Sequence, residues 1–188
     1  MATPPWEAFL RALPTAPGVD AAQIAGNVPA AQKQLNANIL AYFTTGSGRT
    51  PFPPFASDIA RRLRIVAFDV WGDAAEIGLE ITVTESMCNV YGTMHGGCAV
   101  YILDAPSVAA GVLLGLAKGF DGTGVSQSMN IHWHHPAPLG ATLAITTRCI
   151  FADGRARLSR CEMRDKTTGQ LIVSSTHAFL NAGRAVKL

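Results

Sequence analysis

The segment from Cys98 to Ala117 constrains the fold more than any other part of the chain. It is almost entirely apolar or small, yet Asp104 and Pro106 lie near its middle. A helix that is apolar all round must be buried, either inside protein or in a membrane. The segment is long enough to span a bilayer, but a central ionised Asp costs about 2.5–3.5 kcal/mol on insertion scales. We therefore expect a helix enclosed by protein, with no membrane span.

Strand-like patterns fill most of the remaining chain. Two runs precede the apolar segment and four follow it, at 63–71, 76–84, 125–135, 142–151, 155–163 and 170–180. Asp153-Gly154 and Thr168-Gly169 predict tight hairpins between the last three runs. One helix covers six antiparallel strands only if the sheet curves around it. The pattern predicts an α+β fold, a long central helix wrapped by a curved antiparallel sheet of about six strands.

The first 55 residues follow a different pattern. Residues 1–13 predict a short helix that stops at Pro14, and residues 29–46 predict a second helix that ends at Gly46. A Gly/Pro-rich linker occupies 46–55. We therefore divide the chain into an N-terminal helical arm with its linker, 1–55, and a domain built from the central helix and sheet, 56–188.

Composition excludes several classes of protein. Hydrophobic residues make up 48% and charged residues 15% of the chain, which indicates a globular fold with some apolar surface covered by another subunit. The net charge of +2, without Lys/Arg runs, gives no nucleic-acid footprint. The four cysteines lack zinc spacing, and the N-terminus lacks the features of a secretory signal. We expect a cytoplasmic homo-oligomer with reduced thiols.

A glycine-rich turn leads into the apolar segment. Gly92, Gly96 and Gly97 permit a sharp turn and close approach of the backbone to a ligand. The first N–H groups of the following helix have no partner within the helix, and they lie at the positive end of its dipole. Such groups can stabilise an oxyanion. A purely structural start of the helix explains the same residues, and the local pattern leaves both readings open.

Asp104 is the residue of the apolar segment that most suggests chemistry. It follows His95 by nine residues, so the two side chains project from nearly opposite sides of one helix. They cannot form a dyad within one chain, but each could meet a partner from a second subunit. The alternative is a carboxylate that is hydrogen-bonded to a neighbouring strand. We interpret Pro106 as a tolerated bend in a buried helix.

Two further groups suggest chemistry less strongly. His132 and His134 share one face of a strand, as two zinc ligands might, but no third ligand has a persuasive spacing. Cys88 and Cys98 flank the glycine-rich turn without an evident basic partner, so we interpret them as small residues that fill the core. We expect no metal and no cofactor.

Three stretches together resemble a known family: "CNVYGTMHGGCAVYILDAPS", "GVSQSMNIHWHHPAPLGATL" and "DKTTGQLIVSSTHAFL". Over about residues 60–180 the chain is similar to the hotdog-fold acyl-CoA thioesterases, in the branch that contains phenylacetyl-CoA thioesterases and thioesterase superfamily member 2. The resemblance implies a hotdog fold, and dimers that extend the sheet or a dimer of dimers. It also implies hydrolysis of an acyl-CoA or acyl-carrier thioester at sites between subunits.

The same resemblance implies the catalytic positions. Asp104 would be the general base or nucleophile, and Asn89 would orient the attacking water or the thioester. His95 would hold the ligand end of the loop, and the Gly96 N–H would polarise the thioester carbonyl. Ser126 would support the water from the neighbouring chain.

The substrate-binding positions are implied in the same way. The nucleotide of CoA would lie along residues 133–138 and the 151–156 hairpin, where an arginine replaces a family lysine. The positions assigned to substrate binding are Gly97, Ser128, His134, Gly154 and Arg155.

Two rival functions are possible within the same fold. Hotdog dehydratases carry their acid about fourteen residues after the histidine, where this chain has Ala109. That departure argues against a dehydratase. A non-catalytic hotdog protein that binds an acyl or polyketide-like ligand, or a protein partner, remains the alternative to a thioesterase.

Overall fold

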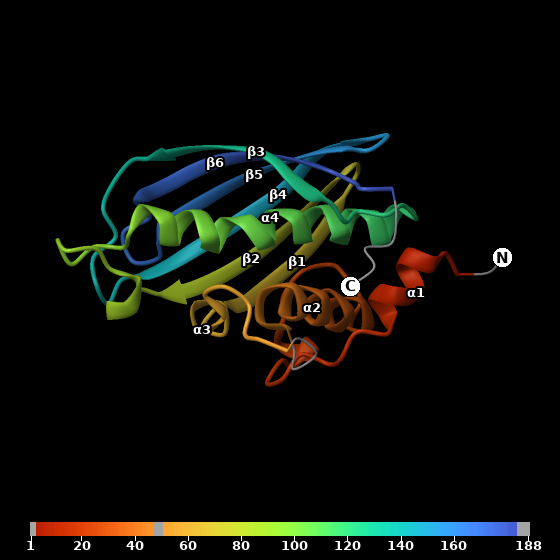
Figure 1. Cartoon of the computed structure of the whole chain (residues 1–188), viewed down its shortest axis with the longest axis horizontal. Coiled ribbons are helices and arrows are strands. Elements are labelled where there is room, and N and C mark those ends of the chain that lie inside the picture. Colours follow the sequence, from red (N-terminus) through yellow and green to blue (C-terminus); the bar gives the residue numbers. More distant parts are fainter. Residues whose placement is uncertain (1–2, 47–50, 184–188) are drawn as a thin grey trace.

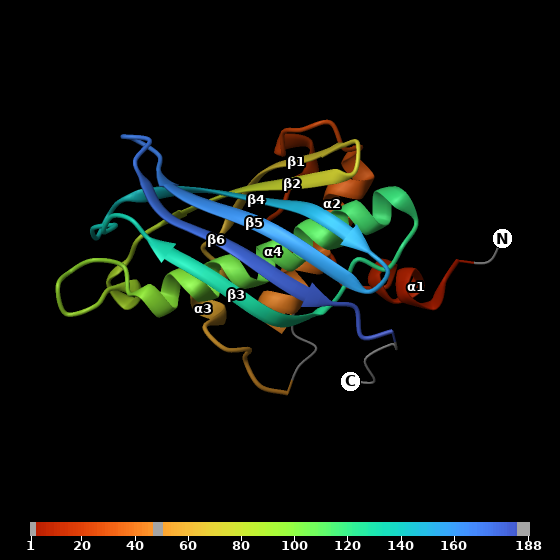
Figure 2. The same cartoon turned by 90° about the horizontal axis from the view of Figure 1, so that it is seen from above.

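A long helix, α4 (Gly96–Lys118), lies across one face of a six-stranded antiparallel sheet (Figures 1 and 2). The computed structural model describes residues 3–46 and 51–183. The strands are β1 (Arg64–Trp71), β2 (Ala74–Thr82), β3 (Val125–Trp133), β4 (Thr142–Asp153), β5 (Ala156–Asp165) and β6 (Leu171–Leu180). Their order in the sheet is β1-β2-β4-β5-β6-β3. The predicted wrapped-helix α+β fold, a hotdog-like arrangement, is confirmed.

The apolar character of α4 is explained by its burial in the sheet. Ile102, Leu103, Ala110 and Leu113 have no exposed surface, and they pack in one core cluster with inward residues of the sheet. Although α4 is long and apolar enough to cross a membrane, 67% of its most apolar window is buried inside the protein. Burial of each such Leu or Ile side chain contributes about 1.5–3 kcal/mol.

Pro106 does not interrupt α4, which continues for twelve residues beyond it. Two strand hydroxyls bind carbonyls at this level of the helix. Thr147 Oγ1 donates to the Pro106 carbonyl oxygen at 3.0 Å, and Ser159 Oγ donates to the Ser107 carbonyl oxygen at 2.7 Å. These bonds fix the helix to β4 and β5 beside Asp104, and they agree with the interpretation of Pro106 as tolerated.

The predicted hairpins are also confirmed. Gly154 and Gly169 take positive φ angles, 51° and 73°, in the β4–β5 and β5–β6 turns. β3 differs from the other strands because seven of its nine residues are exposed, whereas β2, β4, β5 and β6 alternate between buried and less buried positions.

The N-terminal arm contains the two predicted helices, α1 (Pro5–Arg11) and α2 (Ala30–Thr45), and Gly46 ends α2 in the left-handed conformation. α2 packs against α4 (Figure 1). Leu10, Leu13, Ile39 and Val112 form a second core cluster that joins the arm to α4. The arm is therefore fastened to the central helix by apolar contacts.

Some elements were not predicted. These are the single turn η3 (Glu85–Met87) and the short helix α3 (Ser57–Ala60), whereas the single turn η1 (Ala21–Gln23) lies in a segment whose pattern indicates a loop with a weak helical turn. Ala25 pairs in parallel with Ala67 of β1, outside the named strands. Of the linker predicted at 46–55, residues 47–50 lie outside the described residues.

Candidate functional site

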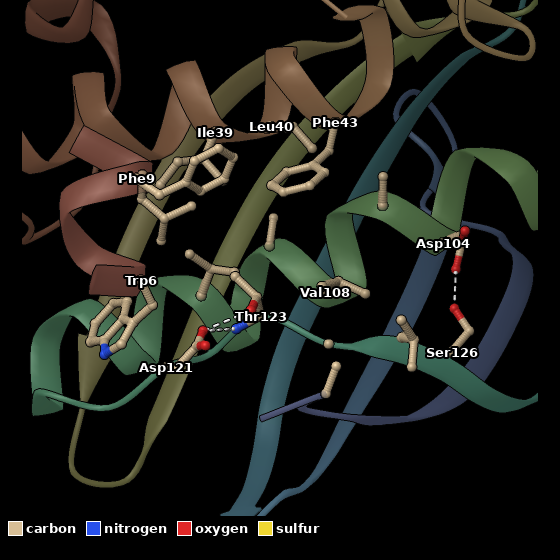
Figure 3. A pocket seen from close by; sticks show the side chains of 17 residues that line it. Trp6, Phe9, Ile39, Leu40, Phe43, Asp104, Val108, Asp121, Thr123 and Ser126 are labelled. Atoms are coloured by element: carbon tan, nitrogen blue, oxygen red, sulfur yellow. Dashed lines mark hydrogen bonds between the residues drawn. The ribbon is translucent and has the colours of Figure 1, made fainter. Parts of the chain in front are cut away.

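Asp104 and Ser126 meet within a single chain. Asp104 projects from the middle of α4, with half of its side chain, 51%, exposed. Ser126, near the start of β3, donates its hydroxyl to Asp104 Oδ1 at 3.2 Å (Figure 3). The prediction that Ser126 reaches the site from a neighbouring chain is wrong for this contact, because β3 begins beside the middle of α4.

A buried histidine lies behind this carboxylate. His177 of β6 has no exposed surface, and its Nε2 atom lies 3.7 Å from Asp104 Oδ1. Its Nδ1 atom is 2.5 Å from Ser107 Oγ, which also donates to the Asp104 carbonyl oxygen at 2.5 Å. Burial lowers the pKa of His177, and the negative charge of Asp104 opposes this effect. The imidazole is therefore neutral at neutral pH, and it is held against the helix turn that carries Asp104.

His177 was missed by the reasoning from sequence. The strand 171–180 alternates, and Ser175, His177 and Phe179 are the buried members of its later half. That alternation is a signal that could have found His177, because a histidine on the inward face of a strand must bond to another buried polar group.

The glycine-rich turn builds a different arrangement at the start of α4. His95 is the N-cap, and its Nδ1 atom accepts from the Gly97 N–H at 2.9 Å. Among the described residues, none accepts a hydrogen bond from the Gly96 N–H. A Cβ placed on Gly96 would lie 3.2 Å from Trp133 Nε1, so the end of β3 lies against this turn. Gly96 therefore offers a free donor at the positive end of a 23-residue helix.

Asn89 shapes the same turn. Its Oδ1 atom accepts from the Tyr91 N–H at 2.9 Å, and its Nδ2 atom donates to Thr93 Oγ1 at 3.1 Å. In this chain the amide thus closes the loop 89–93. Its expected contact with water or with the thioester stays a prediction.

The catalytic candidates fall into two separate groups in one chain. Gly96 and Asp104 are eight residues apart on α4, which places them about 12 Å apart along the axis and roughly 80° apart around it. Asp104, Ser126 and His177 form one half-site, which we call the acid half-site. His95, Gly96 and Gly97 form the other, the turn half-site.

The predicted substrate-binding residues divide in the same way. Leu180 of β6 pairs with both Val125, which precedes Ser126, and Ala156. Gly154 and Arg155 therefore lie at the end of the sheet that carries the acid half-site. His134 lies at the opposite end, which carries the turn half-site, and its Nε2 atom is 2.8 Å from Ser174 Oγ.

The two ends of the sheet are about 26 Å apart along β6. One nucleotide cannot span that length, so residues 133–138 and 151–156 of the same chain cannot both contact one nucleotide. Arg155 is exposed, and its Nε atom donates to the Asn181 carbonyl oxygen at 2.8 Å. Ser128 lies on β3 between the two ends, opposite Ala178.

The remaining candidates are thiols and a metal. Cys88 and Cys98 pack against the main core cluster, as interpreted from sequence. Burial raises the pKa of Cys98 to about 11, so this thiol is protonated at neutral pH and is a weak nucleophile. Within residues 3–46 and 51–183, no group of three or more His, Cys, Asp or Glu could hold a metal ion.

A cavity of about 480 Å³ opens beside the acid half-site (Figure 3). It lies between the arm helices, α4 and the start of β3, and both Asp104 and Ser126 line it. Its lining is otherwise mostly apolar, which is typical of sites for small organic ligands. The geometry thus joins a carboxylate, a hydroxyl and an apolar cavity.

Comparisons with known proteins identify the family. Residues 91–172 match the sequence model of the thioesterase superfamily. Acyl-coenzyme A thioesterase 13 of Mus musculus is 33% identical over 98 residues, which cover 52% of this chain and 67% of that protein.

Two solved structures share the fold. Thioesterase superfamily member 2 of Mus musculus has a TM-score of 0.57 at 23% identity, over 76% of this chain and 92% of that one. A hypothetical thioesterase of Streptococcus pneumoniae, solved with coenzyme A, has a TM-score of 0.55 at 20% identity, over 65% and 90%. The chain has the hotdog fold and belongs to the thioesterase superfamily.

Proposed function

We propose that this protein hydrolyses an acyl-CoA or acyl-carrier thioester to a free acid and a thiol. The observation that carries the proposal is the acid half-site, where a half-exposed carboxylate bonds to Ser126 at the edge of an apolar cavity. The name of the mouse relative, and the coenzyme A in the Streptococcus pneumoniae structure, favour acyl-CoA as the substrate class.

In the proposed mechanism, Asp104 activates water. The water oxygen bonds to the thioester carbonyl carbon while its proton passes to the carboxylate. The tetrahedral intermediate then breaks its carbon–sulfur bond, and the thiolate leaves and takes up a proton. Ser126 orients the carboxylate or the water. A direct attack by Asp104, followed by hydrolysis of the resulting anhydride, is the alternative route.

The negative charge that develops on the carbonyl oxygen needs a donor. The Gly96 N–H fits this role because it is free and lies at the positive end of α4. Asp104 and Gly96 of one chain are too far apart to act on one carbonyl group. The proposed active site therefore combines the acid half-site of one chain with the turn half-site of a second.

The orientation of β3 explains how two copies would achieve this. Ser126 near its start lies against Asp104, and Trp133 at its end lies against Gly96. If two β3 strands pair antiparallel about a two-fold axis at Met129, Ser126 of one copy faces His132 of the other. Each acid half-site then lies beside the other copy's turn half-site. We propose this dimer as the active unit, alone or within a dimer of dimers.

The direct test measures thiol release from a panel of acyl-CoAs by wild type, Asp104→Ala and Asp104→Asn. Loss of a general base typically costs 10²–10⁴-fold in rate, so both variants should lose at least about 100-fold while they retain the wild-type fold by circular dichroism. Equal background rates in all three proteins would reject hydrolysis and favour the non-catalytic binding protein.

A further inference from the structure

The cavity beside Asp104 is roofed by the N-terminal arm, which lies outside residues 91–172, the part of the chain that matches the sequence model of the family. Its volume of about 480 Å³ is within the range of small-molecule sites. The roof residues are Trp6, Phe9 and Leu10 of α1, with Ile39, Leu40 and Phe43 of α2. The floor residues on α4 are Ala105, Val108, Ala109 and Val112.

We infer that the arm is a specificity element that encloses the acyl group of the substrate, and that it selects uncharged apolar acyl groups of medium length. This inference rests on the proposed function, because the acyl group enters the cavity only if its carbonyl is bound at Asp104. The sequence model of the family matches residues 91–172, so the arm lies outside that match.

The floor residues give the direction and length of the cavity, which we call the chamber. Asp104, Val108 and Val112 follow one another at four-residue intervals, so they form a stripe on one face of α4. The stripe is about 12 Å long. An extended chain covers about 1.2 Å per bond, so roughly ten carbon atoms fit between Asp104 and the far end.

The charges at the two ends disfavour anionic acyl groups. Asp104 lies at one end, and Asp121 lies at the other, where its Oδ1 atom accepts from Thr123 N–H and Oγ1 (Figure 3). Among the described residues that line the cavity, none is Lys or Arg. A terminal carboxylate on the acyl chain would therefore meet like charge without a compensating cation.

The roof is anchored, but part of its apolar surface remains uncovered. Leu10 and Ile39 pack with Val112 in the second core cluster, whereas Phe9 and Phe43 line the cavity and are 42% and 52% exposed. Both rings make edge contacts with Tyr42, at centroid distances of 6.1 and 5.3 Å, which restrict their orientation. A bound acyl group would cover this apolar surface.

The experiment fills or enlarges the chamber and measures chain-length preference. Val108→Phe narrows the floor, Phe43→Ala opens the roof, and Ala31→Phe is the matched control on the exposed start of α2. The substrates are acetyl-, hexanoyl-, decanoyl-, tetradecanoyl- and succinyl-CoA. We expect wild type to prefer decanoyl-CoA and to act poorly on succinyl-CoA.

Val108→Phe should reduce the decanoyl-to-acetyl ratio of kcat/KM by about tenfold or more, since each methylene in a tight pocket is worth about 10-fold or more. Phe43→Ala should shift the optimum toward tetradecanoyl-CoA, and Ala31→Phe should leave the profile unchanged. An unchanged profile in both chamber variants, with Asp104-dependent hydrolysis intact, would overturn the inference alone.

Calorimetry separates this failure from failure of the proposed function. Decanoyl-CoA and CoA are titrated into Asp104→Asn and into Asp104→Asn/Val108→Phe. We expect Asp104→Asn to bind decanoyl-CoA at least about tenfold more tightly than CoA. Asp104→Asn/Val108→Phe should lose this difference in affinity. Equal affinities for both ligands in Asp104→Asn would reject the chamber whether or not wild type hydrolyses thioesters.

Discussion

The two edges of the sheet are treated differently by the same chain. At the β1 edge, Ala25 donates to the Val66 carbonyl at 2.9 Å and accepts from the Phe68 N–H at 3.1 Å. The Asn27 side chain adds two bonds to the Val70 backbone, each 2.9 Å long. At the β3 edge, no strand of the described residues pairs on the outer side. The arm therefore covers one edge and leaves the other open.

An open edge strand normally carries features that prevent pairing, such as Lys, Pro or inward charges. β3, "VSQSMNIHW", contains no charged residue and no proline, and Val125 and Trp133 are each 56% exposed. It also joins the two half-sites, with Ser126 near one end and Trp133 at the other. The difference between the edges shows that β1 is completed within the chain, and it supports the proposal that β3 is completed by a second copy.

The largest expected effect comes from charges on the open edge. In the proposed dimer, Ser128 of one copy faces Asn130 of the other, so Ser128→Lys/Asn130→Lys places like charges opposite each other twice. We expect monomers by light scattering and a loss of thioesterase activity of about 100-fold or more, because the oxyanion donor comes from the second copy.

The control for this change is Thr146→Lys/Ile150→Lys, which adds the same charge to exposed positions of β4. It should keep the oligomeric state of the wild type. A fully active monomer with lysines on β3 would contradict the proposed role of this edge.

At the covered β1 edge, we expect a substitution to lower the stability of the fold without changing the oligomeric state. Gly26 has a φ of +99°, and a Cβ at this position would lie 2.0 Å from the Phe68 carbonyl oxygen. Gly26→Ala must displace Ala25 from β1, which we expect to cost about 3 kcal/mol in the free energy of unfolding. Urea denaturation measures this loss.

Gly18→Ala is the matched control, because Gly18 also has a positive φ, +72°, but a Cβ there would have nothing within 4 Å of it. The change should cost about 1 kcal/mol, from backbone strain alone. Equal costs for the two variants would show that the contact of the arm with β1 contributes nothing to stability.

The smallest expected effect concerns pH. The pKa of buried His177 is lowered below its ordinary value, so the unfolded chain binds a proton at a higher pH than the folded chain does. Stability should therefore fall as the pH is lowered through about 6.5, the ordinary histidine value. His177→Asn should flatten this part of the curve of unfolding free energy against pH. If the substitution leaves this slope unchanged, groups other than His177 cause the pH dependence of stability.

Local patterns predicted most of the fold. The strands were predicted from the alternation of apolar and polar residues, and α4 was predicted from its uniform apolarity. Because one helix and six strands have few ways to share a core, these elements also predicted the wrapped arrangement. The pairing of Ala25 with β1 was not predictable, because it depends on the tertiary position of an irregular segment. The short helix α3 gave no periodic signal for a different reason, because it is only four residues long.

The site was predicted in part. Asp104 stood out because a carboxylate in an apolar segment is informative. His177 was missed because its partners, Ser107 and Asp104, are about seventy residues away in the sequence. Ser126 was also a candidate, but its hydrogen bond to Asp104 of the same chain depends on where β3 lies against α4, which no local pattern specifies.

The most direct test of the central claim, a site shared between two chains, mixes two inactive variants. Asp104→Asn removes the acid, and Gly96→Pro removes the free N–H at a helix position that tolerates proline. His95 already has the extended conformation that precedes a proline, with a φ of −63° and a ψ of 136°. Gly96→Ala retains the N–H and should keep more activity than Gly96→Pro.

The two inactive proteins are unfolded and refolded together at equal concentration. Half of the resulting dimers are mixed, and each mixed dimer contains one site with both native half-sites, so activity should rise to about a quarter of the wild-type value. Activity of the mixture equal to the mean of the two parent proteins, with mixed dimers shown to be present by mass spectrometry, would contradict the shared site.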